Sequence, residues 1–277
     1  MQTTLLGRKA RELLAQPSDA VVTGWGSHAM YFLHESGEVF WLADAVTPPH
    51  ARAVLLGGDL PLWLPGTSCG STGHSLTARG RPGITLHAPV WTPPAPTRTV
   101  SWGTVLARTQ RLADSFSFSP PRWVGEAREA ARSGDLEELL RWGQKLVGLG
   151  PGLTPLGDDF LGGALFAAWL ASRLVPGWRW AETKLEEFLI WSRERTSRLS
   201  ATLLADLAHG EGPAPLHHLA RVLLRGGSPP ALWHAAHELV QVGHSSGLAC
   251  LGGFCAVWSQ PSPQESEGKL ARTQREN

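Results

Sequence analysis

The chain has 277 residues, of which 42% are hydrophobic, and a formal net charge of +1. A length of this order predicts one large domain or two smaller ones, each with a real hydrophobic core. Because the charges almost balance, the composition favours neither a nucleic-acid surface nor a strongly acidic partner. The three cysteines form no Cys-x-x-Cys pair, so they support neither a disulfide framework nor a zinc ribbon.

The first twenty residues, MQTTLLGRKARELLAQPSDA, contain no continuous apolar core of the signal-peptide type. The longest apolar stretch, residues 161–170, is too short for a bilayer-spanning helix, which needs about 20 residues. We therefore expect a cytoplasmic protein that makes no membrane contact.

Residues 1–98 predict a β-rich N-terminal domain. Two apolar and aromatic runs flank HESGE at 34–38, which is typical of a hairpin. Further short apolar runs alternate with glycine and proline, as in RAVLLGGDLPLWLPG and GITLHAPVWTP. This punctuation favours a small barrel or sandwich over a parallel sheet with crossover helices.

After WTPPAPTRT at 91–99, apolar residues recur three to four positions apart, which predicts a mainly α-helical domain over 99–258. One long helix is expected over 181–210, with a leucine stripe that includes Leu185, Leu199 and Leu207. The polar residues 259–277 predict a disordered tail. The expected fold class is thus α+β, with a β-rich domain followed by a helical one.

The segment GLGPGLTPLGDDFLGG at 148–163 combines a glycine-rich turn with an acidic pair. One interpretation is helix entry alone. Thr154 would be the N-cap, Pro155 would take the first helical position, and Asp158 and Asp159 would complement the helix dipole.

The alternative interpretation is an anion site. Gly148, Gly150 and Gly152 give more backbone freedom than a turn needs, and free N–H groups beside a helix N-terminus attract anions. Gly157 in the first turn costs about 1 kcal/mol relative to alanine, which indicates a close approach to the backbone. Gly162 and Gly163 would allow another helix to pack tightly.

Known phosphate motifs do not match this segment. No Lys-Ser/Thr follows the glycines, and the spacing is not that of a dinucleotide fingerprint. The pair Asp158 and Asp159 could instead hold Mg²⁺ against a phosphate or carboxylate. Helix entry, an anion site and a magnesium site therefore remain open.

The turn GHSSG at 243–247 formally matches the elbow of serine hydrolases, but no Asp or His follows it and helical spacing precedes it. We predict instead a helix that ends near Val242, a turn, and a second helix capped by Ser245 or Ser246. His244 would then face the same anion as a proton donor or acceptor. A core histidine in a plain helix–helix turn is the alternative.

Two further groups are weaker candidates. In RERTSRLS at 193–200, the hydroxyls of Thr196, Ser197 and Ser200 are unusual inside a helix and could point at the glycine-rich loop, while Arg195 or Arg198 would suit a carboxylate, carbamoyl or phosphate group. A solvated face is the alternative. His234, His237 and the adjacent Glu238 could share a helix face, but their spacing is not that of a known zinc helix.

The segments GLGPGLTPLGDDFLGG, RTSRLSATLLADLAHGE and VGHSSGLACLGG, in this order, resemble the AllH-like family over roughly residues 100–258. A member of this family is a subunit of the anaerobic oxamate carbamoyltransferase of allantoin degradation. The chain departs from the family's pattern at Leu156, where a small Ser is common, and near Ala249, where an Asp is often found.

The resemblance implies a part in the phosphorolysis of oxalurate to oxamate and carbamoyl phosphate, together with two other subunits. The glycine-rich loop would then cradle phosphate, Arg195 or Arg198 would clamp the carboxylate, and His244 or Asp158 would move a proton. Two other hypotheses stay open. The chain could be a non-catalytic accessory subunit, or a Mg²⁺-dependent enzyme that acts on a phosphorylated small molecule.

Overall fold

The computed structural model describes residues 1–116, 118 and 121–258. The chain forms two compact units, one of Met1–Pro94 with Gly212–Ala214 and one of Ala95–Glu211 with Pro215–Asn277. The residues predicted as a disordered tail, 259–277, lie outside the described part. None of the described helices combines the length and apolar character that crossing a membrane requires.

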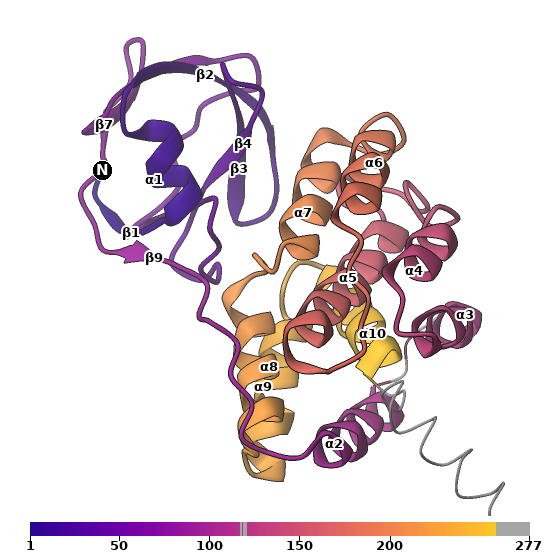
Figure 1. The fold of residues 1–277 in the computed structure, drawn as a ribbon. Helices are drawn as coiled ribbons and strands as arrows, with labels where there is room; N and C mark the ends of the chain where they lie inside the picture. Colours follow the sequence, from indigo (N-terminus) through magenta and orange to yellow (C-terminus); the bar gives the residue numbers. More distant parts are fainter. Residues whose placement is uncertain (117, 119–120, 259–277) are drawn as a thin grey trace, which may run out of the picture. The chain divides into compact units, whose positions relative to one another are not determined.

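The first unit is built on one nine-stranded sheet with the order β8-β7-β6-β2-β3-β4-β5-β1-β9. Its strands are β1 (Thr3–Gly7), β2 (Pro17–Trp25), β3 (Ala29–His34), β4 (Val39–Ala43), β5 (Ala53–Leu56), β6 (Ser68–Thr72), β7 (Ser75–Ala78), β8 (Ile84–Thr85) and β9 (Val90–Trp91). The sheet curls until Gln2, just before β1, forms a bridge with Thr85 of β8 (Figure 1). This curling agrees with the prediction of a β-rich unit.

The first unit encloses its own core. The short helix α1 (Arg8–Leu14) lies within the curl of the sheet in Figure 1, and its Ala10 and Leu14 are buried among strand residues. The rings of Phe32 and Phe40 stack with centroids 4.8 Å apart. These two residues come from β3 and β4, which form the predicted hairpin, with Gly37 at φ 85° in its turn.

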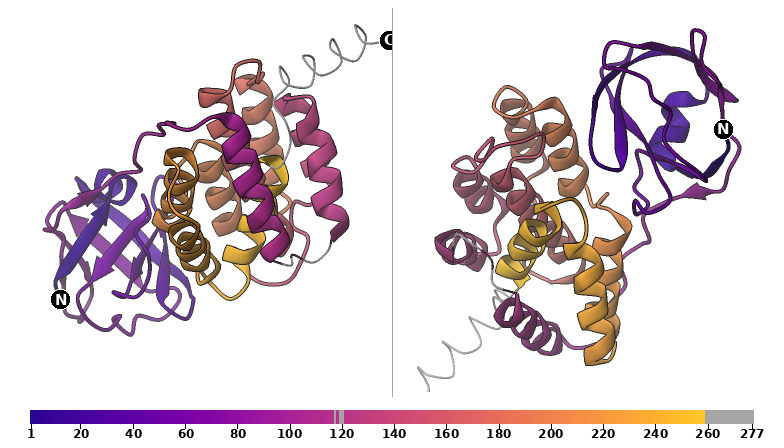
Figure 2. Two further views of the ribbon diagram at one scale, coloured as in Figure 1. Left: turned by 90° about the horizontal axis from the view of Figure 1, so that it is seen from below. Right: turned by 180° about the vertical axis from the view of Figure 1, so that it is seen from behind.

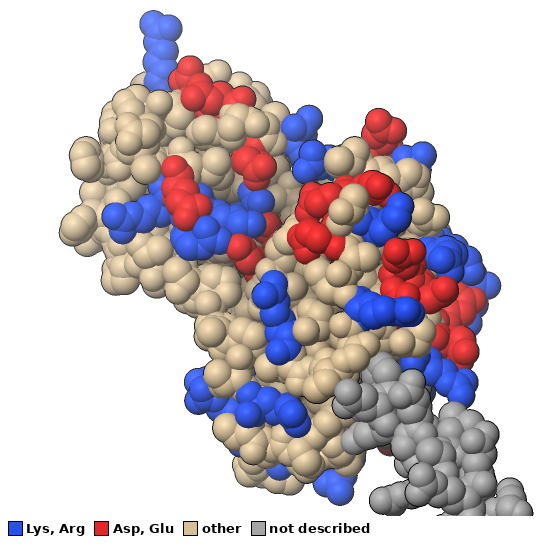
Figure 3. All heavy atoms as spheres, in the orientation of Figure 1, with Lys and Arg blue, Asp and Glu red and all other residues tan. Residues whose placement is uncertain are grey.

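The second unit is helical, as predicted. Its helices are α2 (Trp102–Ser115), α3 (Pro121–Arg132), α4 (Leu136–Gly143), α5 (Leu156–Leu174), α6 (Glu182–Ser192), α7 (Arg198–Ala208), α8 (Ala214–Arg225), α9 (Pro229–Val240) and α10 (Ser246–Trp258). Figure 2 shows them from two further sides. On the face drawn in Figure 3, acidic and basic side chains are interspersed, so no broad single-sign patch covers it.

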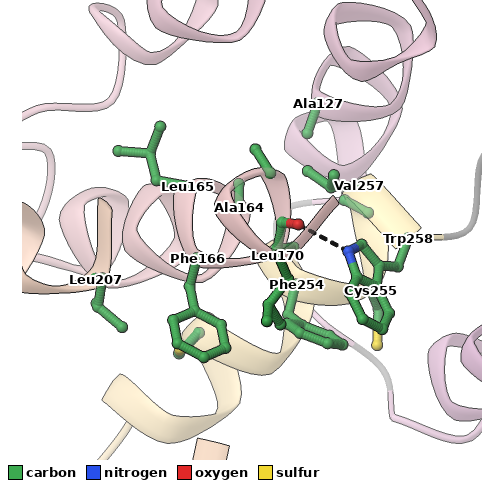
Figure 4. Close-up of a cluster of buried hydrophobic side chains, with 14 of the residues drawn as sticks. Ala127, Ala164, Leu165, Phe166, Leu170, Leu207, Phe254, Cys255, Val257 and Trp258 are labelled. Carbon is green, nitrogen blue, oxygen red and sulfur yellow. Dashed lines mark hydrogen bonds between the residues drawn. The ribbon is translucent and has the colours of Figure 1, made fainter. Parts of the chain in front are cut away.

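The centre of the helical unit is the pair α5 and α10. Most residues of both helices are buried, among them Phe166 and Phe254. Trp258 packs at the end of α10, and its indole N–H donates to the Ala167 carbonyl of α5 at 2.8 Å (Figure 4). This hydrogen bond satisfies the one polar atom of an otherwise apolar side chain.

Glycines allow the two helices to approach closely. A Cβ at Gly163 would lie 2.0 Å from the Cys250 carbonyl oxygen, and one at Gly253 would lie 1.8 Å from the Phe160 carbonyl oxygen. Contacts this short are impossible, so any larger residue would force the helices apart. The predicted role in tight helix packing is thus confirmed for Gly163, whereas a Cβ at Gly162 would meet the Leu207 side chain of α7, with Cδ1 2.5 Å away.

The long helix predicted over 181–210 is wrong. The structure has two helices there, α6 and α7, separated by a turn at 193–197. Ser197 is the N-cap of α7, and its hydroxyl accepts a hydrogen bond from the Ser200 N–H at 3.0 Å. The apolar spacing continues across the break, which is why periodicity alone predicts a single helix. The capping hydroxyl is the physical reason for the interruption.

Candidate functional site

The glycine-rich loop between α4 and α5 depends on left-handed backbone angles. Gly148, Gly150 and Gly152 have φ values of 75°, 123° and 100°. A Cβ at Gly148 would lie 2.2 Å from the Arg195 carbonyl oxygen, and one at Gly157 would lie 2.2 Å from the Leu146 carbonyl oxygen. The close approach that Gly157 indicated is therefore made by the chain's own backbone.

Thr154 does not cap α5, so that prediction is wrong. The helix begins at Leu156, the N-cap position is Pro155, and no side chain caps it. Thr154 lies one residue too early, and its hydroxyl is instead 3.1 Å from the Ser246 hydroxyl at the start of α10. The first turns of α5 and α10, far apart in sequence, therefore begin side by side.

Asp158 is buried, with 3% of its surface exposed, and both of its carboxylate oxygens have partners. Oδ1 accepts from the Gly148 N–H at 2.7 Å, and Oδ2 accepts from the hydroxyls of Ser200, at 2.6 Å, and Thr196. The carboxylate thus joins the glycine-rich loop to the turn between α6 and α7. The Ser197 hydroxyl adds a hydrogen bond to the Leu153 carbonyl.

These contacts place the three hydroxyls of 196–200 against the loop, as the sequence suggested. They also define what Asp158 does in this arrangement. A buried carboxylate that accepts several hydrogen bonds holds its donors firmly, because any donor lost would leave charge unsatisfied. Catalytic and Mg²⁺-binding roles for Asp158 stay predictions.

Asp159 differs from its neighbour. The pKa of Asp159 is raised to about 7, chiefly because the carboxyl is buried and also because of the negative charge of Asp158, and this value already includes the lowering by the hydroxyls of Ser246 and Thr154. Its Oδ2 is shielded from solvent and has no hydrogen-bond partner among the described residues. Such a carboxyl exchanges a proton near neutral pH, which is the property that acid–base chemistry needs.

The turn before α10 matches the helix–turn–helix prediction. Helix α9 ends at Val240, Gly243 has φ 64°, and the Ser245 carbonyl accepts the first helical hydrogen bond from Ala249 at 3.0 Å. His244 and Ser245 are exposed. A helix, not a strand, precedes GHSSG, in keeping with the rejection of a hydrolase elbow.

The arginines of the 193–200 segment take different places. The Arg195 guanidinium lies 4.3 Å from the Trp191 ring centroid and donates to the Trp191 carbonyl at 2.9 Å. In this position Arg195 lies back along α6, so a role as an anion clamp requires a change of rotamer. Arg198 is the first residue of α7.

The weaker metal candidates on α9 are not arranged as a shared site. Glu238 pairs with His218 of α8 at 2.5 Å and lies 3.4 Å from His234, whereas the His237 ring packs against Phe116 and Trp233. Within the described residues, a different trio, Glu182, Glu186 and His209, brings metal-ligand atoms within 4.8 Å of one another.

The sequence interpretation missed two arrangements. It expected the GHSSG turn and the glycine-rich loop to face one anion, but it did not predict the direct contact between the hydroxyls of Thr154 and Ser246, because no local pattern links residues 92 positions apart. It also missed the trio at Glu182, although two glutamates four apart on a helix are a visible signal.

Comparison with protein families supports the resemblance. Residues 146–258, less than half of the chain, match the family model described as oxamate carbamoyltransferase subunit AllH. The matched range contains the glycine-rich loop, the turn between α6 and α7 and the start of α10. No solved structure matches the chain.

Proposed function

We propose that the chain acts as an AllH-type subunit of an oxamate carbamoyltransferase and binds a small anion where α5 and α10 begin. The observation that carries this proposal is the position of Asp159. Its carboxyl has a pKa near 7 and one buried oxygen without a partner, and it lies beside the hydroxyls of Thr154 and Ser246.

The electrostatics of this place suit a phosphate or carboxylate. Two helix N-termini contribute the positive ends of their dipoles, although the Gly157 and Gly247 N–H groups in their first turns donate to the chain's own carbonyls. The hydroxyls of Thr154, Ser245 and Ser246 add donors, and a protonated Asp159 adds one more. Gly152 supplies a loop backbone that a ligand can approach, since a Cβ there would meet nothing within 4 Å, whereas a Cβ at Gly150 would lie 3.0 Å from the Leu156 nitrogen.

The proton balance of the reaction assigns a role to Asp159. Attack of hydrogen phosphate on the ureido carbonyl of oxalurate forms the C–O bond of carbamoyl phosphate and breaks the C–N bond to the oxamate nitrogen. The proton lost by hydrogen phosphate must reach that leaving nitrogen. A carboxyl that titrates near neutral pH can accept the proton from hydrogen phosphate and then donate a proton to the leaving nitrogen. His244 is the other candidate for this transfer.

Other residues would hold the site rather than react. Asp158, through its hydrogen bonds to Gly148, Thr196 and Ser200, would hold the glycine-rich loop against the turn between α6 and α7. Gly148 and Gly157 have no side chain, which allows the backbone at Arg195 and Leu146 to pack against them. The carboxylate end of oxamate would be bound by Arg195 or Arg198. Because the matched family is described as a subunit, we further propose that partner subunits complete the enzyme.

A second candidate function is a non-catalytic accessory subunit. The observation in its favour is that both carboxylate oxygens of Asp158 accept hydrogen bonds from the chain's own groups. In addition, the chain's own backbone packs directly against Gly148 and Gly157, which leaves no room for a ligand beside them. In that case the glycine-rich motif packs the fold, and a partner carries the chemistry.

The experiment is a carbamoyl-transfer assay with oxamate and carbamoyl phosphate, on the full chain with and without co-expressed partner subunits. We expect Asp159→Asn to lower kcat by about 100-fold or more, the size typical of lost acid–base catalysis, with a smaller change in KM. The matched control is Asp114→Asn, an exposed aspartate on α2.

Phosphate binding by calorimetry separates the two candidates. An active complex in which Asp159→Asn keeps both full rate and full phosphate affinity would overturn the anion-site proposal and favour the accessory role. No transfer in any combination of subunits would overturn the transferase assignment itself.

A further inference from the structure

The helices α6 and α7 form a hairpin that has a side-chain cluster at its open end. Glu182 and Glu186 lie one turn apart on α6, and His209 directly follows the last residue of α7 (Figure 1). The His209 Nε2 atom is 3.0 Å from an oxygen of Glu186 and 3.5 Å from one of Glu182. Three potential ligand atoms therefore converge from two helices.

The orientation of His209 is fixed by a group outside the cluster. Its Nδ1 lies 2.8 Å from the Ala205 carbonyl oxygen. Because a carbonyl only accepts, Nδ1 must carry the hydrogen, so in the neutral ring Nε2 presents its lone pair to the two carboxylates. A carbonyl that holds the far nitrogen in this way is the usual outer partner of a metal-binding histidine.

Glu182 is also oriented from outside. The Trp180 indole N–H donates to its Oε2 at 2.6 Å, while Oε1 is the oxygen that faces His209. One carboxylate oxygen is thus engaged and the other is directed into the cluster. A side chain held in this way loses less conformational entropy when it binds a ligand.

The charges and distances fit a divalent cation. Glu182 and Glu186 are exposed and His209 is partly exposed, so a cation can reach the cluster from solvent, where it would offset the repulsion between the two carboxylates and the nitrogen lone pair. Ligand atoms about 2.0–2.1 Å from a tetrahedral zinc ion lie roughly 3.3 Å apart, and the two distances from Nε2 bracket that value. A nitrogen among the ligands favours zinc over magnesium or calcium.

We propose that Glu182, Glu186 and His209 bind one Zn²⁺ ion, with water in the fourth position. The ion would join the first turns of α6 to the end of α7. The closed end of the same hairpin carries Thr196 and Ser200, which hold Asp158, so the metal would brace the element that positions the glycine-rich loop. The expected role is structural, and it does not depend on the proposed reaction.

The test is calorimetric titration of the full, tag-free chain with ZnCl₂. We expect one ion per chain, and at least tenfold weaker binding in His209→Ala and in Glu186→Gln. Two variants serve as matched controls and should bind as the native chain does. Glu187→Gln removes an exposed carboxylate next along α6, and Glu238→Gln removes the carboxylate between His218 and His234.

Thermal unfolding gives the second readout. Excess Zn²⁺ should raise Tm by a few degrees in the native chain and in both controls, and leave His209→Ala unchanged, because a ligand that binds only the folded state stabilises it. The proposal is overturned if the native chain binds no zinc at micromolar concentrations, if His209→Ala binds it equally well, or if Glu238→Gln abolishes binding. In the first case the cluster is an ion pair of protonated His209 with the glutamates.

Discussion

The hydroxyl oxygens of Thr154 and Ser246 lie 3.1 Å apart, although 92 residues separate them in the chain. This contact joins the start of α5 to the start of α10 and encloses Asp159, whose pKa both hydroxyls lower. The two helix N-termini and the carboxyl form one electrostatic unit, and its members can be tested separately.

Loss of the Ser246 hydroxyl should raise the pKa of Asp159. The hydroxyl stabilises the charged carboxylate, so Ser246→Ala favours the protonated form and moves the titration above its native value of about 7. Carboxyl carbon NMR across pH 5–9 measures this shift. Ser245→Ala is the control, because this exposed neighbour does not affect the Asp159 pKa. An unchanged titration in Ser246→Ala would contradict the assigned contact.

Asp159 should also make folding stability depend on pH. Its folded pKa of about 7 lies above the ordinary value of 3.8, so the folded state binds more protons between these limits. Stability contributed by the protonated carboxyl is therefore complete below about pH 4 and is lost as pH rises toward 7. Asp159→Asn should remove this dependence and be more stable than the native chain at pH 8, by on the order of 1–3 kcal/mol.

Urea unfolding at pH 5 and pH 8 measures the effect. The stability difference between Asp159→Asn and the native chain should grow from the lower to the higher pH. Asp114→Asn, an exposed change on α2, should show the same small difference at both values. A constant difference for Asp159→Asn would argue against a raised pKa.

Substitution of Asp158 should cost stability at every pH near neutral. Asp158→Ala leaves the Gly148 N–H and the hydroxyls of Thr196 and Ser200 without their acceptor. The expected loss is about 2–4 kcal/mol, since the groups are buried and charge-assisted. Urea unfolding measures it, with Asp114→Ala as the control. Full stability together with lost phosphate binding would instead favour a direct ligand role for Asp158.

The glycines between α5 and α10 should not tolerate a methyl group. In Gly163→Ala the new Cβ meets the Cys250 carbonyl at 2.0 Å, so the helices must separate and the chain should lose about 3 kcal/mol or more. The matched control is Gly103→Ala in α2, where a Cβ meets nothing within 4 Å. That change should be neutral or stabilise by up to about 1 kcal/mol, because alanine favours helix. Similar thermal stabilities for both variants would contradict the close packing.

Much of the fold was predictable because it follows local pattern. Apolar runs between glycine and proline indicated the β-rich unit, and the 3.6-residue period indicated the helices. The hairpin at residue 37 and the tight packing at Gly163 both followed from residue types that suit only a few conformations.

Local pattern failed where partners were distant. The apolar spacing of α6 continues into α7, so periodicity does not reveal the break at 193–197, where Ser197 caps the second helix. Thr154 looked like an N-cap, but Ser246 holds its hydroxyl in a different place. In both cases the hydroxyl contacts a residue far away in the sequence, Leu153 for Ser197 and Ser246 for Thr154, and local spacing does not reveal such a partner.

The sequence by itself determined that residues 148–163 form a glycine turn that leads into a helix with two acidic residues in its first turn. Only the tertiary structure decided that these aspartates differ. Asp158 points into hydrogen-bond donors from the loop and from α7, whereas Asp159 points toward the start of α10 and keeps an oxygen without a partner. Adjacent residues on a helix point in different directions and so contact different neighbours. These neighbours determine the charge and reactivity of each carboxyl, and a local sequence pattern does not identify them.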